Sequence, residues 1–162
     1  MAAGQFRVGL GSDVHALVAG RDLIIGGVKI DYPLGLQGHS DADVLLHAVC
    51  DALLGAAGLG DIGEFFPDTD PAYKGISSML LLDQCVAKIQ EKGFDISNLD
   101  AVIFAQAPKM SPHKADMAAN IARAMGVSLD RVNIKATTTE RLGFVGQKQG
   151  IAAQASVLLY EK

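Results

Sequence analysis

The pattern of apolar and polar residues predicts a chain that mixes strands and helices. Every second residue from 6 to 10 is apolar, which is typical of a strand, and this strand is expected to continue through residues 13–15. Two short apolar runs flank Gly26 and Gly27 between residues 23 and 30, which is the pattern of a β-hairpin. Further strands are predicted at residues 100–106, 132–136 and 151–159.

Helical spacing of apolar residues predicts three helices, at residues 41–54, 78–92 and 112–125. Ser40 and Asp43 resemble a capping box at the start of the first helix. Ser111 is expected to cap the third helix, with Pro112 in its first turn. Together with the strands, these helices imply one domain spanning residues 1–162, of the α/β class and the α+β type, in which helices pack on one face of a mixed sheet.

The composition limits the classes of function. The 162 residues are 49% hydrophobic and 20% charged, which is ordinary for a globular protein. A formal net charge of -4 leaves no dominant basic surface, which argues against a nucleic-acid-binding protein. Because the 14 Lys and Arg residues form no run, bound metal cations would supply the positive charge that a phosphorylated substrate needs.

Cysteine usage and the N-terminal sequence predict a cytoplasmic protein. Cys50 and Cys85 form no C-x-x-C pair, so we expect two reduced, buried thiols rather than a zinc ribbon or a redox motif. The N-terminal residues lack the apolar core of a signal peptide. No apolar run reaches the ~20 residues of a membrane span.

Two short motifs together predict a metal site. Asp13 and His15 share one face of the first strand, and His47 on the first helix would complete a set that leaves the fourth tetrahedral position open, as in catalytic zinc sites. Asp43 and Asp51 lie one helical turn either side of His47 and are candidate hydrogen-bond partners for a ligating imidazole. An isolated D-x-H is more often a polar pair at a strand end, and the helical residues alone could form a solvated face. Their combination favours the metal site.

Four further features carry less weight. Residues 58–63 fit G-x-G-x-x-G but follow a helix, so a dinucleotide site is rejected and residues 58–70 are interpreted as a loop that contacts substrate or simply connects elements. Glu140, in the segment 137–140 after a predicted strand, is an oxygen ligand suited to magnesium, although threonines are also ordinary strand residues. A Ser-His-Asp hydrolase is disfavoured because there is no G-x-S-x-G motif. His113 is interpreted as a surface helix residue.

Five collinear segments resemble the 2-C-methyl-D-erythritol 2,4-cyclodiphosphate synthases of the non-mevalonate isoprenoid pathway: SDVHA, LIIGGV, GHSDADVLLHAVCDALLGAAGLGDIGEFFPDTDP, AQAPKM and IKATTTERLGF. The resemblance implies a phosphorus-oxygen lyase that converts 4-diphosphocytidyl-2-C-methyl-D-erythritol 2-phosphate into the cyclic diphosphate and CMP. In this reaction the 2-phosphate attacks the β-phosphate of the same molecule. The resemblance also implies a homotrimer with active sites between subunits, one Zn²⁺ per subunit, and Mg²⁺ or Mn²⁺ with the substrate diphosphate.

The resemblance implies roles for individual residues. Zinc would be held by Asp13, His15 and His47, and magnesium would contact Glu140. His39 and Thr138 would stabilise the transition state. Residues 61–63 and 66–70 would hold the methylerythritol portion, and residues 105–111 would form the cytidine pocket. The full substrate-binding set is Asp13, Val14, His15, His39, Ser40, Asp61, Ile62, Gly63, Phe66, Pro67, Asp68, Thr69, Asp70, Ala105, Gln106, Ala107, Pro108, Lys109, Met110, Ser111, Thr137, Thr138, Thr139, Glu140 and Phe144.

One departure from the family pattern lies after Phe144, where Gln147 stands in the position of a common Arg and Gln149 follows. Family members with that Arg can hold an isoprenoid diphosphate near the trimer axis, so the sequence leaves this ligand open here, with Lys148 as a partial substitute for the Arg. The sequence also leaves open two alternatives to the cyclodiphosphate synthase function. One is a metal phosphohydrolase with Asp61 or Asp68 as base, and the other is a catalytically silent protein that binds a metal and a cytidine nucleotide.

Overall fold

A mixed sheet organises the part of the chain that the computed structural model describes, residues 5–67 and 69–162. Its strands lie in the order β4-β1-β7-β5-β6. They are β1 (Phe6–Val18), β4 (Gly35–Leu36), β5 (Phe94–Phe104), β6 (Val132–Thr137) and β7 (Gly150–Glu161). β5 and β6 run parallel, whereas the other neighbouring pairs run antiparallel. The predicted mixed sheet is therefore confirmed.

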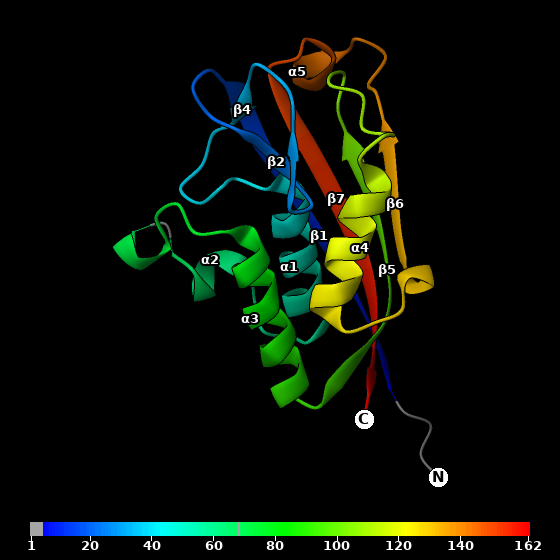
Figure 1. Ribbon diagram of the computed structural model, residues 1–162. Coiled ribbons are helices and arrows are strands. Elements are labelled where there is room, and N and C mark those ends of the chain that lie inside the picture. The colour runs from blue at the N-terminus through cyan, green and yellow to red at the C-terminus, as the bar shows by residue number, and fades with distance from the viewer. Residues whose placement is uncertain (1–4, 68) are drawn as a thin grey trace.

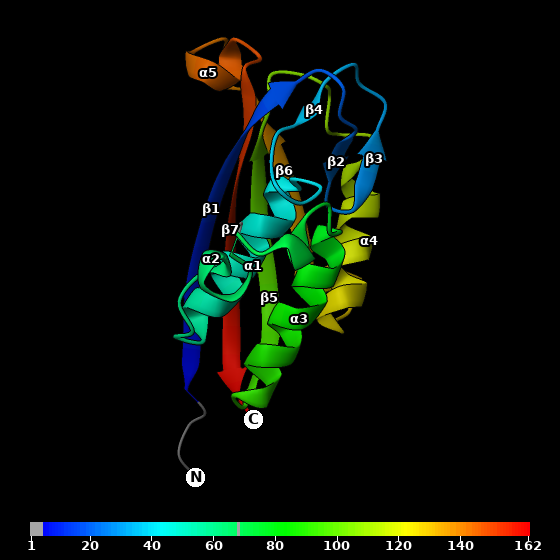
Figure 2. The ribbon, with the colours of Figure 1, turned by 90° about the vertical axis from the view of Figure 1, so that its left-hand side faces the viewer.

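Three helices cover one face of this sheet, as Figures 1 and 2 show from two directions. They are α1 (Val44–Ala56), α3 (Ser78–Glu91) and α4 (Lys114–Met125), and the predicted hairpin consists of β2 (Leu23–Ile25) and β3 (Val28–Ile30). α1 packs on β1 and β7, α3 packs against α1, and α4 packs on β6. Most of α1 is buried, because it lies between the sheet and α3. Among the described residues, no helix has the length and apolar character needed to cross a bilayer.

Four short helices occur where the apolar pattern predicts none. They are α2 (Ile62–Phe65), η1 (Pro71–Tyr73), η2 (Leu129–Arg131) and α5 (Gly143–Gly146). Each spans about one turn, which is too short for a helical periodicity to appear in the sequence. α2 lies inside the segment 58–70, which was predicted to be a loop.

The first helix starts later than predicted. α1 begins at Val44, and its N-cap is Asp43, whose Oδ1 accepts a hydrogen bond from the Leu46 N–H. Ser40 does not cap the helix, because its Oγ accepts from the N–H of Ala42 in the preceding loop. The capping-box prediction was therefore wrong.

The start of the third long helix was also misplaced. α4 begins at Lys114, and no side chain caps it. Residues 110–113 instead form a turn that is closed by a hydrogen bond from the His113 N–H to the Met110 carbonyl. Ser111 and Pro112 therefore lie before the helix, and Ser111 is left free to line a cavity described below.

Two glycines allow α1 to pack directly on the backbone of β1. A Cβ atom on Gly9 would lie 1.9 Å from the carbonyl oxygen of Ala52, and one on Gly11 would lie 1.9 Å from that of Ala48. Real side chains do not approach backbone atoms this closely, so only glycine fits at these positions. The next residues on the same face of β1 are Asp13 and His15, which consequently stand beside the first turn of α1.

The other face of β1 is apolar and exposed. Phe6, Val8, Leu10 and Val14 are 68%, 72%, 69% and 54% exposed, respectively. They alternate along the strand with residues that face α1. Four large apolar side chains on one face of a strand, interrupted only by Ser12, are unusual for a surface that faces water, and such a patch typically marks an interface.

Candidate metal centre and active site

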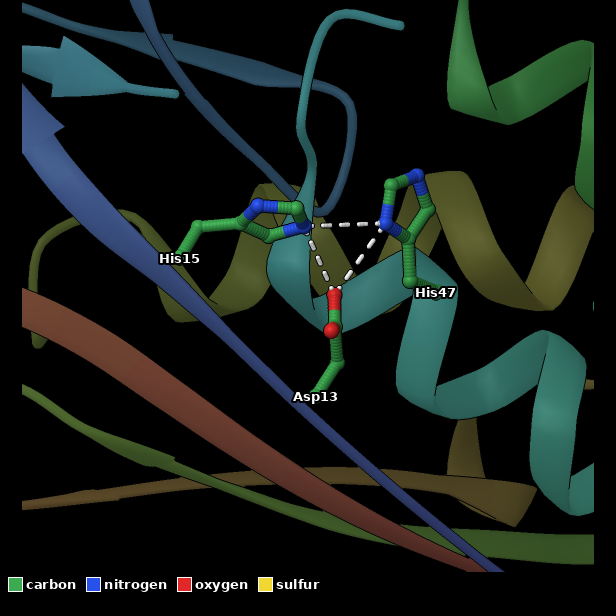
Figure 3. A group of neighbouring side chains, drawn as sticks. All are labelled: Asp13, His15 and His47. Atoms are coloured by element: carbon green, nitrogen blue, oxygen red, sulfur yellow. Dashed lines mark hydrogen bonds and ion pairs between the residues drawn. The ribbon is translucent and has the colours of Figure 1, made fainter. Parts of the chain in front are cut away.

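Asp13, His15 and His47 point toward one another from β1 and α1, as Figure 3 shows. Asp13 Oδ2 lies 2.9 Å from His15 Nε2 and 3.1 Å from His47 Nδ1, and the two nitrogens are 3.2 Å apart. Ligand atoms about 2.0–2.1 Å from a tetrahedral zinc stand roughly 3.3–3.4 Å apart. The donor set and its spacing therefore fit a metal ion such as zinc, and the predicted grouping of Asp13, His15 and His47 is confirmed, whereas the identity of the metal stays a prediction.

Each imidazole makes a hydrogen bond through the nitrogen that points away from Asp13, and these bonds determine which nitrogen faces the metal site. His15 Nδ1 lies 2.6 Å from the Gln37 carbonyl, to which it can only donate, so Nε2 is left with a free lone pair. His47 Nε2 lies 2.9 Å from Ser78 Oγ and 3.2 Å from Ser40 Oγ, and His47 Nδ1 faces Asp13. The two rings thus present different nitrogens to the same point.

The electrostatics of the centre favour a bound cation. Burial alone would raise the pKa of Asp13, but hydrogen bonds from His15 and His47 outweigh it and hold that pKa well below its usual range. Burial alone would lower the pKa of His15, but the hydrogen bond to Asp13 raises it above its usual value. A metal ion bound at these three residues would compete with a proton for His15 Nε2.

Neither helical aspartate contacts an imidazole, so the prediction that Asp43 or Asp51 orients a ligand was wrong. Asp43 is fully buried, and its carboxylate accepts from the N–H groups of Gly26, Gly27 and Leu46. Burial raises the pKa of Asp43 to about 6, against the lowering effect of these three donors. Asp51 accepts from the Ile62 N–H, and burial also raises its pKa.

A cavity of 270 Å³ opens beside the three ligands. His39 lines it, and the Nε2 atom of His39 is buried without a hydrogen-bond partner among the residues that the structure describes. A buried nitrogen without a partner is costly, which indicates that a ligand completes its hydrogen bonding. The loop that carries His39 is fixed by Arg21, whose guanidinium donates to the carbonyls of Gly38 and Ser40.

The cavity gathers part of the predicted substrate-binding set, including Ile62, Gly63 and Phe66 of the predicted methylerythritol site. The predicted residues that line it are Asp13, His15, His39, Ser40, Ile62, Gly63 and Phe66. Asp61, Pro67, Thr69 and Asp70 are not among its lining residues, and Asp68 lies outside the described residues. Val14 lies on the opposite face of β1. Sequence analysis missed Tyr73, Ile76 and Leu81, which belong to no motif and reach the cavity only because η1, the following loop and α3 fold beside it.

The predicted cytidine segment lines a second cavity, of 410 Å³. All of residues 105–111 contribute to it, together with Ala136, Thr137 and Thr138. The two segments meet because β5 and β6 are parallel neighbours and end at the same edge of the sheet. Among the described residues, none lines both cavities, so within one chain the predicted cytidine segment and the metal cluster border separate cavities.

Thr138 and Glu140 lie together, apart from the aspartate and histidines. Thr138 Oγ1 donates to Glu140 Oε1 over 2.9 Å, and Glu140 has a positive φ of 53°. Neither residue lines the 270 Å³ cavity. Phe144 lies in α5 and is 46% exposed, and Gln147, which ends that helix, is also exposed.

Comparison with known proteins places the chain in a family. The model of the YgbB family matches residues 6–160. The chain belongs to the YgbB family. A relative from Thiobacillus denitrificans is 62% identical over 155 residues, which are 96% of this chain and 97% of the relative. One from Desulforamulus reducens is 61% identical and covers 96% of this chain and 99% of its own.

Both relatives are named 2-C-methyl-D-erythritol 2,4-cyclodiphosphate synthase. The resemblance inferred from the sequence is therefore confirmed. YgbB-family membership makes this chain an enzyme of the cyclodiphosphate synthase type, a phosphorus-oxygen lyase of non-mevalonate isoprenoid biosynthesis.

Several solved structures are similar to this chain in both fold and sequence. IspF of Plasmodium falciparum in complex with CDP has a TM-score of 0.86 and 32% identity, over 99% of each chain. A 2C-methyl-D-erythritol-2,4-cyclodiphosphate synthase in a CDP-bound form has a TM-score of 0.87 and 37% identity, and the match covers 94% of this chain and 99% of that chain. The bifunctional IspDF from Campylobacter jejuni has a TM-score of 0.95 and 47% identity, but this chain covers only 43% of that longer one.

Proposed function

We propose that this chain converts 4-diphosphocytidyl-2-C-methyl-D-erythritol 2-phosphate into 2-C-methyl-D-erythritol 2,4-cyclodiphosphate and CMP, in the cytoplasm. The observation that carries the proposal is the convergence of Asp13, His15 and His47 at the wall of a cavity large enough for a small phosphorylated polyol. Attack of the 2-phosphate on the β-phosphate forms one P–O bond and breaks the bond to CMP, which leaves with the electron pair.

Metal ions would address the main obstacle to this reaction, which is repulsion between two phosphate groups. Zn²⁺ at Asp13, His15 and His47, with Mg²⁺ or Mn²⁺ near Glu140, would neutralise the charge of the reacting groups. CMP is a weakly basic leaving group, so no strong general acid is required. The rate would then depend mainly on positioning and on charge neutralisation.

The chain's own residues would position the substrate. His39 has a buried Nε2 that can donate to, or accept from, a substrate oxygen in the cavity. Thr138 borders the second cavity, where its hydroxyl can contact a phosphate of a bound cytidine nucleotide. The segment 105–111 would hold the cytidine, consistent with the CDP complexes of related structures.

A homotrimer would bring the two cavities together. In one chain no residue lines both, and the row of exposed apolar residues on β1 provides a surface that another subunit can cover. An active site between subunits would combine the metal ligands and His39 of one chain with Thr138, Glu140 and the segment 105–111 of its neighbour. In such a trimer, Gln147 in place of Arg would disfavour an isoprenoid diphosphate near the axis.

Hydrolysis is the less favoured reaction. Asp61, one of the two bases considered for it, caps α2 by accepting from the Glu64 N–H and does not line the metal cavity. Phosphorus NMR of the products separates the possibilities. We expect CMP and a cyclic diphosphate from the CDP-linked substrate. A linear hydrolysis product would refute the proposal in favour of a phosphohydrolase, and binding of CMP without turnover would indicate a silent protein.

Replacement of His47 tests the site. His47→Ala removes one of three ligands, so we expect loss of stoichiometric zinc and of turnover while the oligomeric state is unchanged. Metal content, product formation and size-exclusion chromatography measure these three properties. Retained activity in the zinc-free variant would contradict the assignment of the site.

A further inference from the structure

A chain of hydrogen bonds extends from His47 away from the metal centre. His47 Nε2 lies 2.9 Å from Ser78 Oγ, and Ser78 Oγ lies 2.5 Å from Asp41 Oδ1. The other carboxylate oxygen of Asp41 accepts from the Ser78 N–H over 3.0 Å. Ser78 is fully buried, in the first turn of α3, whereas His47 is on α1 and Asp41 is in the loop before α1.

The carboxylate determines the direction of these hydrogen bonds. An ionised Asp41 can only accept, so the Ser78 hydroxyl must donate its single proton to it. Ser78 Oγ is then left with lone pairs toward His47, and it can only accept from His47 Nε2. The proton of a neutral His47 is consequently placed on Nε2, and the lone pair is placed on Nδ1, which faces Asp13 and His15.

The hydroxyl of Ser40 does not fix the direction in the same way. Ser40 Oγ lies 3.2 Å from His47 Nε2 and accepts from the Ala42 N–H. Its own proton has no carboxylate acceptor among the contacts of the described residues, so Ser40 can either donate to His47 or accept from it. The longer distance also makes it the weaker partner.

We propose that Ser78 and Asp41 are positioning residues that hold His47 with its proton on Nε2 and its Nδ1 lone pair directed at the metal. This proposal rests on the proposed role of Asp13, His15 and His47 as zinc ligands. The two residues act through His47 and do not touch the metal or the substrate. They also connect the metal centre to the start of α3, so that a shift of α3 would weaken metal binding.

Zinc affinity of the purified protein, measured by competition with a chelator, tests the proposal. Ser78→Ala removes the acceptor without adding bulk, and we expect zinc affinity to fall about 10- to 100-fold. Ser77→Ala is the matched control, because it removes the adjacent hydroxyl, which caps α3 through the Met79 N–H and does not contact His47. Its zinc affinity is expected to stay within about twofold of the original, since it loses only a cap.

Asp41→Asn provides an independent second variant. The amide both donates and accepts, so the direction of the Ser78 hydroxyl is no longer fixed, and we expect a loss of zinc affinity at least as large as in Ser78→Ala. In the zinc-loaded protein, the proton resonance of His47 Nε2 should move upfield and exchange faster with water in Ser78→Ala but not in Ser77→Ala. A purely structural effect of Ser78 would not change this resonance selectively.

The outcomes separate this inference from the proposed function. Normal zinc affinity in both Ser78→Ala and Asp41→Asn would overturn the inference, whatever the reaction is. If both variants bind zinc weakly but the original protein makes no cyclic product, the inference stands and the proposed reaction fails. Thermal unfolding of the zinc-free variants checks that each is folded, and a loss of affinity in a folded variant supports the proposal.

Discussion

Asp43 joins the β2-β3 hairpin to the start of α1, and its replacement should destabilise the protein strongly. Its carboxylate accepts from the N–H groups of Gly26 and Gly27 in the hairpin turn and from that of Leu46 in the helix. Asp43→Ala leaves all three donors without this partner. We expect a loss of about 2–4 kcal/mol in the free energy of unfolding at neutral pH.

The magnitude follows from opposing contributions. Loss of a helix cap costs about 1 kcal/mol, and each buried N–H without an acceptor costs about 1–3 kcal/mol. These costs are partly offset, because the burial that raises the pKa of Asp43 to about 6 also penalises the ionised carboxylate at neutral pH. Asp43→Asn keeps one acceptor oxygen, which can serve Gly26 and Leu46 but not Gly27. It should therefore lose less than Asp43→Ala.

Urea unfolding at one fixed protein concentration measures the effect, since the stability of an oligomer depends on concentration. Ser77→Ala is the control, because Ser77 caps α3 through a single N–H at an exposed position. It should lose no more than about 1 kcal/mol. If Asp43→Ala lost less than the control, the three hydrogen bonds would not stabilise the junction and the reasoning would be refuted.

Three further outcomes are expected. Zinc affinity should fall as the pH is lowered, beginning above the ordinary histidine pKa, because the raised pKa of His15 keeps a competing proton on it; calorimetric titrations from pH 8 to 5 would contradict this if the affinity stayed constant. Gly11→Ala should destabilise the protein severely or prevent folding, because its Cβ would lie 1.9 Å from the Ala48 carbonyl; an unchanged melting temperature would show that α1 can move away. Leu10→Glu should dissociate the proposed trimer, because it places a charge on the exposed apolar face of β1; a retained trimer in analytical ultracentrifugation would exclude this face from the interface.

The metal cluster was predictable because each ligand followed from a local rule. The period of two along β1 put Asp13 and His15 on one face, and the helical pattern put His47 on α1. The glycines that bring α1 against β1 gave no such signal, because a close backbone approach involves residues about 40 positions apart in the sequence. The sequence therefore predicted which residues bind the metal, whereas the distances between them depend on how closely α1 packs on β1.

The hydrogen-bond partners of the metal-ligating His47 were not predictable by the same rules. Asp43 and Asp51 lie on the same side of the helix as His47, but their carboxylates accept from the N–H groups of Gly26 and Ile62. These N–H groups come close to the helix only when the chain is folded. Ser78 contacts His47 across 31 residues of sequence. In the sequence, Ser78 is distinguished only as the residue that follows Ser77, the N-cap of α3. Likewise, it was family resemblance rather than any local pattern that assigned the segments 105–111 and 137–140 to one substrate-binding set.

In the proposed trimer, the two faces of β1 would link metal binding to assembly. Asp13 and His15 point toward α1, whereas Val14, between them, points to the exposed apolar face with Leu10. A neighbouring subunit that covers this face would pack against the same strand that carries two of the three metal ligands. Because alternate residues of one strand cannot shift independently, a change in the packing of that face would also move the ligands. In the proposed trimer, metal affinity should therefore depend on the oligomeric state, even though all three ligands belong to one chain.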